Sequence, residues 1–161
     1  MEMFLWQLWR GRVLVGDVLY RSGMVNLSCL DCPLCSLEKE SIDHLFLHCT
    51  WSKSLWLDCM AWWGVVGCFN NIVKDWQDGW TSLSPAIKHE RVWNSLFCSI
   101  VWTIWKNRNH FVFEGKIPFV EQAVDWVKFQ LVWGYKYLGR ETQDTVQSLL
   151  RNVKDLCVET N

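Results

Sequence analysis

The sequence lacks any excess of positive charge. Its 16 Lys and Arg residues are outnumbered by 17 Asp and Glu residues, and the formal net charge is −1. Non-specific binding to nucleic acid depends mainly on Lys and Arg side chains that neutralise phosphates. The chain as a whole is therefore a poor electrostatic candidate for tight DNA or RNA binding, although Arg10, Arg12 and Arg21 form a local basic group.

The sequence also lacks a secretory signal and a membrane-spanning run. Its first residues have no basic region, and Gln7 and Arg10 interrupt their apolar run. The apolar run at 95–105 is too short to cross a bilayer and ends at Lys106. We therefore expect an intracellular protein of the nucleus or cytoplasm that is not secreted and makes no membrane contact. In such a reducing compartment, clustered cysteines indicate metal binding rather than disulfides.

Internal repeats, low-complexity tracts and β-hairpin patterns are absent as well. Half of the residues are hydrophobic and 13 are tryptophans, which need a core, an interface or a ligand to cover them. Apolar residues recur with helical spacing, and Asp43 is the expected N-cap of one helix. The expected helices cover residues 3–10, 16–22, 43–63, 87–113, 119–138 and 142–157, with a weakly patterned connection between the third and the fourth.

Residues 29–49 hold four cysteines and two histidines. Cys32 and Cys35 form a C-x2-C turn, whose spacing lets two thiolates point at one ion. His44 and Cys49 follow as an H-x4-C pair. Three thiolates and one imidazole make a closed tetrahedral set for Zn²⁺, so we predict the ligands Cys32, Cys35, His44 and Cys49.

The choice of the fourth ligand involves a geometric tension. On an ideal helix, residues five apart lie about 140° apart around the axis, whereas residues four apart lie about 40° apart. His48 would therefore converge with His44 more easily than Cys49 does, unless the first turn is distorted. Cys49 is preferred because a thiolate is the stronger donor to zinc, and Cys29 is a minor alternative to Cys32 or Cys35. The other cysteines, Cys59, Cys68, Cys98 and Cys157, are expected to be small buried hydrophobic residues.

The expected fold is thus mainly α, with short helices around a small Cys3His zinc knuckle followed by a C-terminal part made of long helices. We divide the chain into a zinc-binding module with a helical lead-in at 1–85 and a C-terminal helical region at 86–161.

Three segments carry a resemblance to a known family. They are CPLC (32–35), HLFLHCTWSKSLW (44–56) and the lead-in WQLWRGRVLVGDVLYRSG (6–23). They resemble the zinc-binding region that follows the reverse transcriptase domain in plant non-LTR (LINE-type) retrotransposons, and WTIWKNRNHFVF (102–113) is similar to a helix that often comes next. Leu14-Val15 stands where the family commonly has Pro-Thr, and because Val cannot cap a helix, we expect the following helix to start weakly.

The resemblance implies a non-catalytic accessory module derived from a retrotransposon polyprotein. A polymerase needs paired carboxylates for two metal ions, and the chain has no Asp-Asp pair. Asp78-Gly79 is not preceded by the strand that an RNase H site requires, and no Ser/His/Asp order, phosphate loop or dinucleotide fingerprint occurs. We therefore expect no enzymatic activity and no small-molecule substrate.

The expected partners are RNA or DNA, bound weakly, and a reverse transcriptase domain or another protein. Basic residues near aromatic ones can contact single-stranded nucleic acid, and the candidates are Arg10, Arg12, Arg21, Lys106 and Arg108. Trp102 and Trp105, beside the last two, are more typical of a helix core. The alternative function is a zinc-stabilised protein–protein interaction module with a Trp-rich helical surface.

Overall fold

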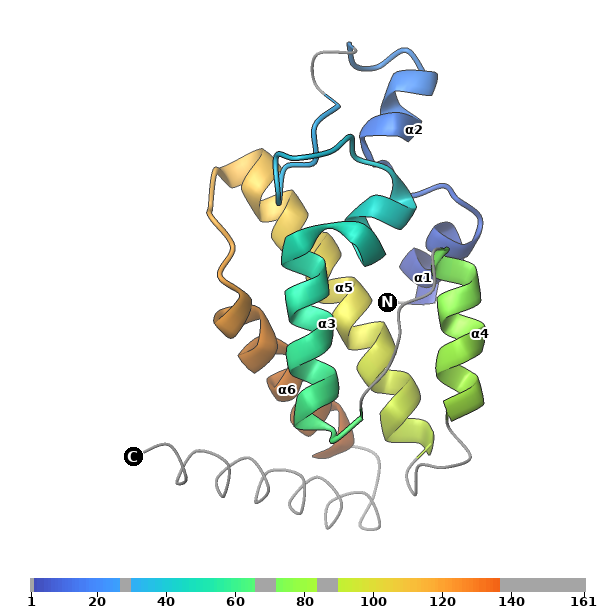
Figure 1. Ribbon diagram of the computed structural model, residues 1–161, viewed down its shortest axis with the longest axis vertical. Coiled ribbons are helices and arrows are strands. Elements are labelled where there is room, and N and C mark those ends of the chain that lie inside the picture. Colours follow the sequence, from blue (N-terminus) through green and yellow to red (C-terminus); the bar gives the residue numbers. More distant parts are fainter. Residues whose placement is uncertain (1, 27–29, 66–71, 84–89, 137–161) are drawn as a thin grey trace.

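The computed structural model describes residues 2–26, 30–65, 72–83 and 90–136, and these are mainly helical (Figure 1). The helices are α1 (Glu2–Trp9), α2 (Gly16–Arg21), a π-helical turn (His44–His48), α3 (Thr50–Trp62), α4 (Val73–Leu83), α5 (Glu90–Glu114) and α6 (Val120–Lys136). Within these residues the β pairing is one isolated bridge between Asp31 and Lys39. The predicted fold class, a mainly α chain with a Cys3His cluster followed by long helices, is confirmed.

The helix expected at 43–63 is in fact two elements. A π-helical turn ends at His48, and Cys49 adopts an extended conformation with ψ 130° before α3 begins. Asp43 stands at the N-cap position of the π-helical turn, but its side chain makes no cap hydrogen bond there, because its carboxylate accepts a hydrogen bond of 2.9 Å from the Val73 N–H at the start of α4. Ser41 Oγ instead accepts the His44 N–H, at 3.1 Å.

Helix α4 lies where a weakly patterned connection was expected. Its buried side chains, Val73, Trp76 and Trp80, follow the i, i+3, i+7 spacing of one helical face. Gly79 and the polar residues between them hide this pattern in the sequence. The helix expected at 142–157, and residues 87–89 of the helix expected at 87–113, lie outside the described residues.

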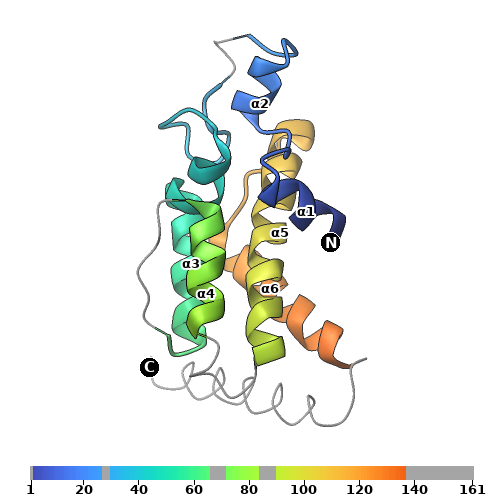
Figure 2. The same cartoon turned by 90° about the vertical axis from the view of Figure 1, so that its right-hand side faces the viewer.

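Helix α5 occupies the middle of the fold. Seen from the side, α3 and α4 overlap as one layer, and α5 stands beside this layer and contacts both helices (Figure 2). One hydrophobic core includes buried residues of α1, the π-helical turn, α3, α4, α5 and α6, on both sides of residue 85, and Val18 of α2 packs against it. The division of the chain at residue 85 stays a prediction.

Tryptophans fill much of this core. Trp56 of α3 is fully buried, and its ring lies 5.7 Å from Trp76, 5.6 Å from Trp80 and 5.5 Å from Phe97, measured between ring centroids. Its indole N–H donates to the Phe46 carbonyl oxygen at 2.7 Å, so the polar atom of this buried ring is satisfied. The core therefore accounts for several of the 13 tryptophans. None of the helices in the described ranges combines the length and apolar character needed to cross a bilayer.

Candidate metal centre

A tight turn carries the first two predicted ligands. The Cys32 N–H donates to the Glu38 carbonyl oxygen at 2.7 Å, and the Ser36 N–H donates to the Cys32 carbonyl oxygen at 2.8 Å. Ser36 closes the turn with a positive φ of 55°, a conformation that non-glycine residues seldom adopt. These bonds place the thiols of Cys32 and Cys35 on the same side of the turn.

The π-helical turn resolves the geometric tension in the second half of the motif. The Cys49 N–H donates to the His44 carbonyl oxygen at 2.6 Å, five residues earlier. Such a wide turn brings residues five apart toward the same face, and π-helical turns are frequent at functional sites. The distortion that an H-x4-C pair requires is therefore present, and Cys49 rather than His48 joins the cluster.

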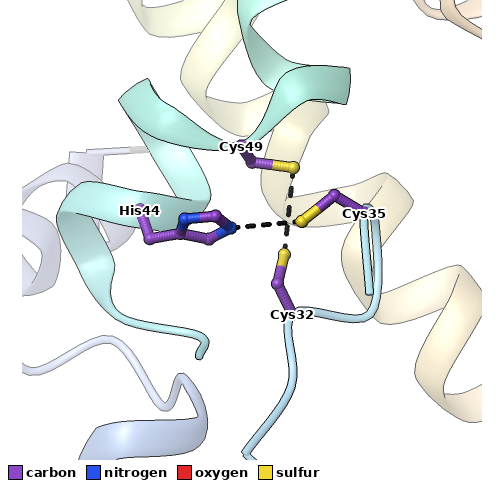
Figure 3. Close-up of side chains that lie close together, drawn as sticks. All are labelled: Cys32, Cys35, His44 and Cys49. Atoms are coloured by element: carbon purple, nitrogen blue, oxygen red, sulfur yellow. Dashed lines mark hydrogen bonds between the residues drawn. The ribbon is translucent and has the colours of Figure 1, made fainter. Parts of the chain in front are cut away.

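The four predicted ligand side chains converge on one point (Figure 3). Their donor atoms all lie within 4.8 Å of one another. The Cys32 and Cys49 sulfurs are 3.8 Å apart, and the Cys35 sulfur lies 3.3 Å from His44 Nε2. A tetrahedral zinc ion with Zn–S bonds of about 2.3 Å separates two sulfur ligands by about 3.8 Å. The donor set and its spacing thus fit zinc, and Cys29 lies outside the described residues.

Burial and hydrogen bonding set the acidity of two of the thiols. The Cys32 thiol donates to Cys49 Sγ and lowers the pKa of Cys49 to about 5, against the effect of burial. The backbone N–H groups of Ser52 and Trp51, in the first turn of α3, act in the same direction as Cys32. The bond to Cys49 raises the pKa of Cys32, and burial adds to this effect. The shared hydrogen bond thus favours a thiolate on Cys49, and thiolate is the form in which both sulfurs would bind a metal.

Glu38 supports the imidazole from outside the cluster. Its Oε2 lies 3.2 Å from His44 Nδ1, the ring nitrogen that faces away from the sulfurs. A carboxylate on Nδ1 fixes the ring orientation and leaves the lone pair of Nε2 for a metal. In the sequence, the six-residue separation between Glu38 and His44 gave no signal for this contact.

Glu40 is the functional residue that the sequence most clearly concealed. Its side chain is buried and accepts two hydrogen bonds of 2.8 Å from Arg108 of α5. It also accepts the Gly16 N–H at 2.6 Å, at the start of α2. Because Val15 offers no side-chain cap, this carboxylate supplies the one that α2 lacks. The segment between the Cys32–Cys35 turn and His44, the knuckle loop, is thereby tied to both α2 and α5.

The predicted nucleic-acid residues occupy different environments. Arg10 and Arg12 are exposed, and their guanidinium carbons lie 5.5 and 5.7 Å from the centroid of the Trp6 ring. Arg21 is exposed and pairs with Asp17 at 3.0 Å, and Lys106 is half-buried beside Trp126. Arg108 is only 6% exposed and its charge is matched by Glu40, so it is a structural ion pair and not a phosphate contact.

The remaining side chains of interest are those of cysteines and tryptophans. Cys59 is fully buried, as expected, whereas Cys98 is half-buried, and Cys68 and Cys157 lie outside the described residues. Trp102 and Trp105 are half-buried and pack on Phe4, with ring centroids 5.2 and 5.8 Å away.

The fold and the cluster define a helical Cys3His metal-binding module. The model of the family described as zinc-binding in reverse transcriptase matches residues 1–56, a stretch that contains all four donors. This match supports a reverse transcriptase zinc-binding domain in the first third of the chain. Comparison with curated proteins and with solved structures gives no significant match.

Proposed function

We propose that the chain is a non-catalytic accessory module in which Cys32, Cys35, His44 and Cys49 hold one structural zinc ion. The observation that carries the proposal is the convergence of four protein donors within 4.8 Å. When bound, the ion supplies a cross-link between the turn that carries Cys32 and Cys35 and the start of α3. In small zinc modules, such binding contributes roughly 10–16 kcal/mol of apparent free energy, which is comparable to the whole stability of a domain.

A closed coordination shell is the reason for assigning a structural role. Catalytic zinc sites use three protein ligands and keep a position for water or substrate, whereas four protein ligands fill the tetrahedron. The carboxylate of Glu38 lies against His44 Nδ1 and orients a ligand instead of facing the sulfurs. We therefore infer that the centre stabilises the fold and catalyses no reaction.

The proposed origin is the polyprotein of a plant LINE-type retrotransposon. Support comes from the family match over 1–56 and from the segments at 6–23, 32–35 and 44–56 that resemble this lineage. In its original context, such a module would lie beside a reverse transcriptase domain and assist its contacts with nucleic acid. The proposed partners are accordingly an RNA or DNA strand and a polymerase domain.

Substitution of Co²⁺ for zinc tests the closed shell directly. We expect the intense visible absorption bands of tetrahedral Co²⁺ bound by thiolates, and we expect them to stay unchanged when azide or cyanide is added. An exchangeable fourth position would instead let these anions bind the metal and shift the bands. A spectrum that changes with added anion would contradict the structural role, and His48→Ala serves as a variant in which the cluster is intact.

The alternative function, a protein–protein interaction module, is favoured by one surface feature. Three exposed aromatic side chains of α6, Trp126, Phe129 and Trp133, stack in a row with centroid separations of 5.4 and 5.8 Å. Exposed aromatic residues are enriched at protein interfaces. An electrophoretic shift assay across salt concentrations separates the two functions, because nucleic-acid binding weakens steeply with salt. Absence of any shift at low salt would favour the protein-binding alternative.

A further inference from the structure

A cleft between α5 and α6 lies outside the residues that match the zinc-binding family. Its volume is about 240 Å³, and it is lined by Lys106, Asn107 and His110 of α5 and by Gln122, Ala123 and Trp126 of α6. A second hollow of about 490 Å³ shares Asn107, His110 and Gln122 and continues along the α5–α6 connection. The two helices pack closely against each other below this connection (Figure 1).

The polar lining of the cleft contains cationic and amide groups. Among the residues that line the two hollows, Lys106 and Lys116 are cationic, His110 carries an imidazole, and no carboxylate occurs. Lys116 is paired with the exposed Glu114 at 2.5 Å and is the main cause of the lowered pKa of Glu114, to which His110 and Lys106 add smaller effects. Lys106 and His110 are therefore the groups that can meet an anion. A phosphate held by these two would replace some of its lost hydration with charge-assisted hydrogen bonds.

The opposite side of α6 has the reverse charge. There, a hollow between α3 and α6 is lined by Asp58, Glu121 and Asp125, with Lys128 as its one basic residue. The acidic residues of α6 that line this hollow thus face α3, whereas Gln122 and Trp126 of the same helix face α5. An anionic ligand is attracted to the α5 side and repelled from the other.

Aromatic rings continue from the edge of the cleft along α6. The Lys106 ammonium lies 5.6 Å from the centroid of the Trp126 ring, and Trp126 stacks on Phe129 with an interplanar angle of 24°. Trp126 is 44% exposed and Phe129 is 50% exposed. Such an arrangement suits a single-stranded polynucleotide, because a cation can contact a backbone phosphate and exposed rings can stack on the neighbouring bases.

We propose that this cleft binds single-stranded polynucleotide, with a backbone phosphate at Lys106 and His110 and neighbouring bases on Trp126 and Phe129. The inference rests on the nucleic-acid partner of the proposed function, but the site lies in α5 and α6 and needs no metal ligand. Its affinity is expected to be modest and sensitive to salt, because one lysine and one imidazole contact the backbone. Of the five basic residues singled out in the sequence, Lys106 alone lines this cleft.

The test measures the fluorescence anisotropy of labelled oligonucleotides, about ten nucleotides long, titrated with the zinc-loaded full chain. Oligouridylate and oligothymidylate are compared at salt concentrations from about 50 to 200 mM. We expect Trp126→Ala and Phe129→Ala each to weaken binding by about tenfold, the usual effect of losing one stacked base. Lys106→Gln should weaken binding and reduce the logarithmic salt slope by about 0.7.

Two control variants match these changes outside the cleft. Trp9→Ala removes an aromatic residue of α1 that is 40% exposed, and Lys128→Gln removes a lysine on the acidic side of α6. Both should change the affinity by less than about twofold, because neither side chain lines the cleft and distant sites with no shared contacts act independently. Tighter binding of oligouridylate would identify RNA through its 2′-hydroxyls, and equal binding would identify recognition of backbone and bases alone.

Absence of binding at the lowest salt, or equal losses in the control and cleft variants, would overturn the proposal. Either result would leave the zinc centre unaffected, since zinc content is measured on the same protein without an oligonucleotide. Circular dichroism of every variant establishes that it is folded before its affinity is compared.

Discussion

Glu40 and Arg108 are 68 positions apart in the sequence, and their side chains meet inside the protein through two hydrogen bonds of 2.8 Å. Glu40 belongs to the knuckle loop and Arg108 to α5, so the pair fastens the metal-binding part to the longest helix. The third hydrogen bond of Glu40, from the Gly16 N–H, adds α2 to the same contact. A buried charge pair contributes little net stability over apolar residues, but removal of one partner leaves the other charge unpaired in the interior.

We predict that Arg108→Met or Glu40→Gln lowers the free energy of unfolding by about 3–5 kcal/mol, because each leaves one buried charge unpaired. The Glu40→Gln/Arg108→Met double variant should be less destabilised than the sum of the single changes. Urea denaturation of the zinc-loaded protein measures all three. The matched control is Asp125→Asn, which breaks an exposed pair with Lys128 at 4.0 Å and should cost less than about 1 kcal/mol. Equal losses in Asp125→Asn and Glu40→Gln would contradict the buried-pair account.

Gly16 and Gly134 should respond to alanine with opposite signs. A Cβ on Gly16 would lie 3.2 Å from Glu40 Oε2 and 3.3 Å from Glu40 Cβ, and Arg108 prevents Glu40 from moving away. Gly16→Ala should therefore destabilise the protein by about 1–3 kcal/mol. Gly134 lies within α6 with nothing within 4 Å of its added Cβ, so Gly134→Ala should stabilise the protein by about 0.5–1 kcal/mol. Thermal unfolding of both variants checks the pair, and a stabilising Gly16→Ala would refute the close approach.

Trp80 and Trp93 form a reciprocal contact between α4 and α5. Their rings stack 3.8 Å apart at 6°, and each indole N–H donates to the backbone carbonyl of the other, at 3.1 and 2.9 Å. Trp93→Phe keeps an aromatic ring but leaves the Trp80 carbonyl oxygen without this donor, so we expect a loss of about 1–3 kcal/mol in chemical denaturation. Trp133→Phe, at a half-exposed position, is the control and should change stability by less than about 0.5 kcal/mol. A neutral Trp93→Phe would show that the hydrogen bond from the Trp93 indole contributes nothing.

Stability should fall in alkaline solution partly through Cys59. Burial raises the pKa of the Cys59 thiol from 9.0 to about 12, although Lys128 opposes the effect. Between these values the unfolded chain loses this proton while the folded chain keeps it, so the free energy of unfolding decreases as the pH rises above 9.0. Between pH 8 and 10 the contribution is about 1 kcal/mol, and it should be missing from Cys59→Ala. Urea denaturation at both pH values compares the two proteins, and identical losses would contradict the assignment.

The sequence predicts the parts of this molecule that depend on neighbouring residues. The C-x2-C and H-x4-C spacings identify the four donors, and the 140° separation expected on a regular helix indicates in advance that the chain must distort between His44 and Cys49. Long helices with many apolar anchors, such as α5, are likewise evident. Helix α4 was missed because three buried residues among polar ones and a glycine give a weak periodic signal.

Contacts between distant segments are the part that the sequence conceals. Asp43 has the residue type of an N-cap, yet its carboxylate bonds to Val73, 30 positions away. The one local indication of the Glu40 pair was a charged residue, Arg108, on the apolar stripe of the expected helix at 87–113. A buried arginine needs an acidic partner, but its spacing cannot say which of the 17 acidic residues provides it.

The zinc content of the purified chain and of two variants tests the central claim most directly. The account predicts one zinc ion per chain, retained in His48→Ala and lost in Cys49→Ser, with helicity decreasing when a chelator removes the metal. Metal-free wild-type protein with full helicity, or zinc lost from His48→Ala and kept by Cys49→Ser, would contradict it.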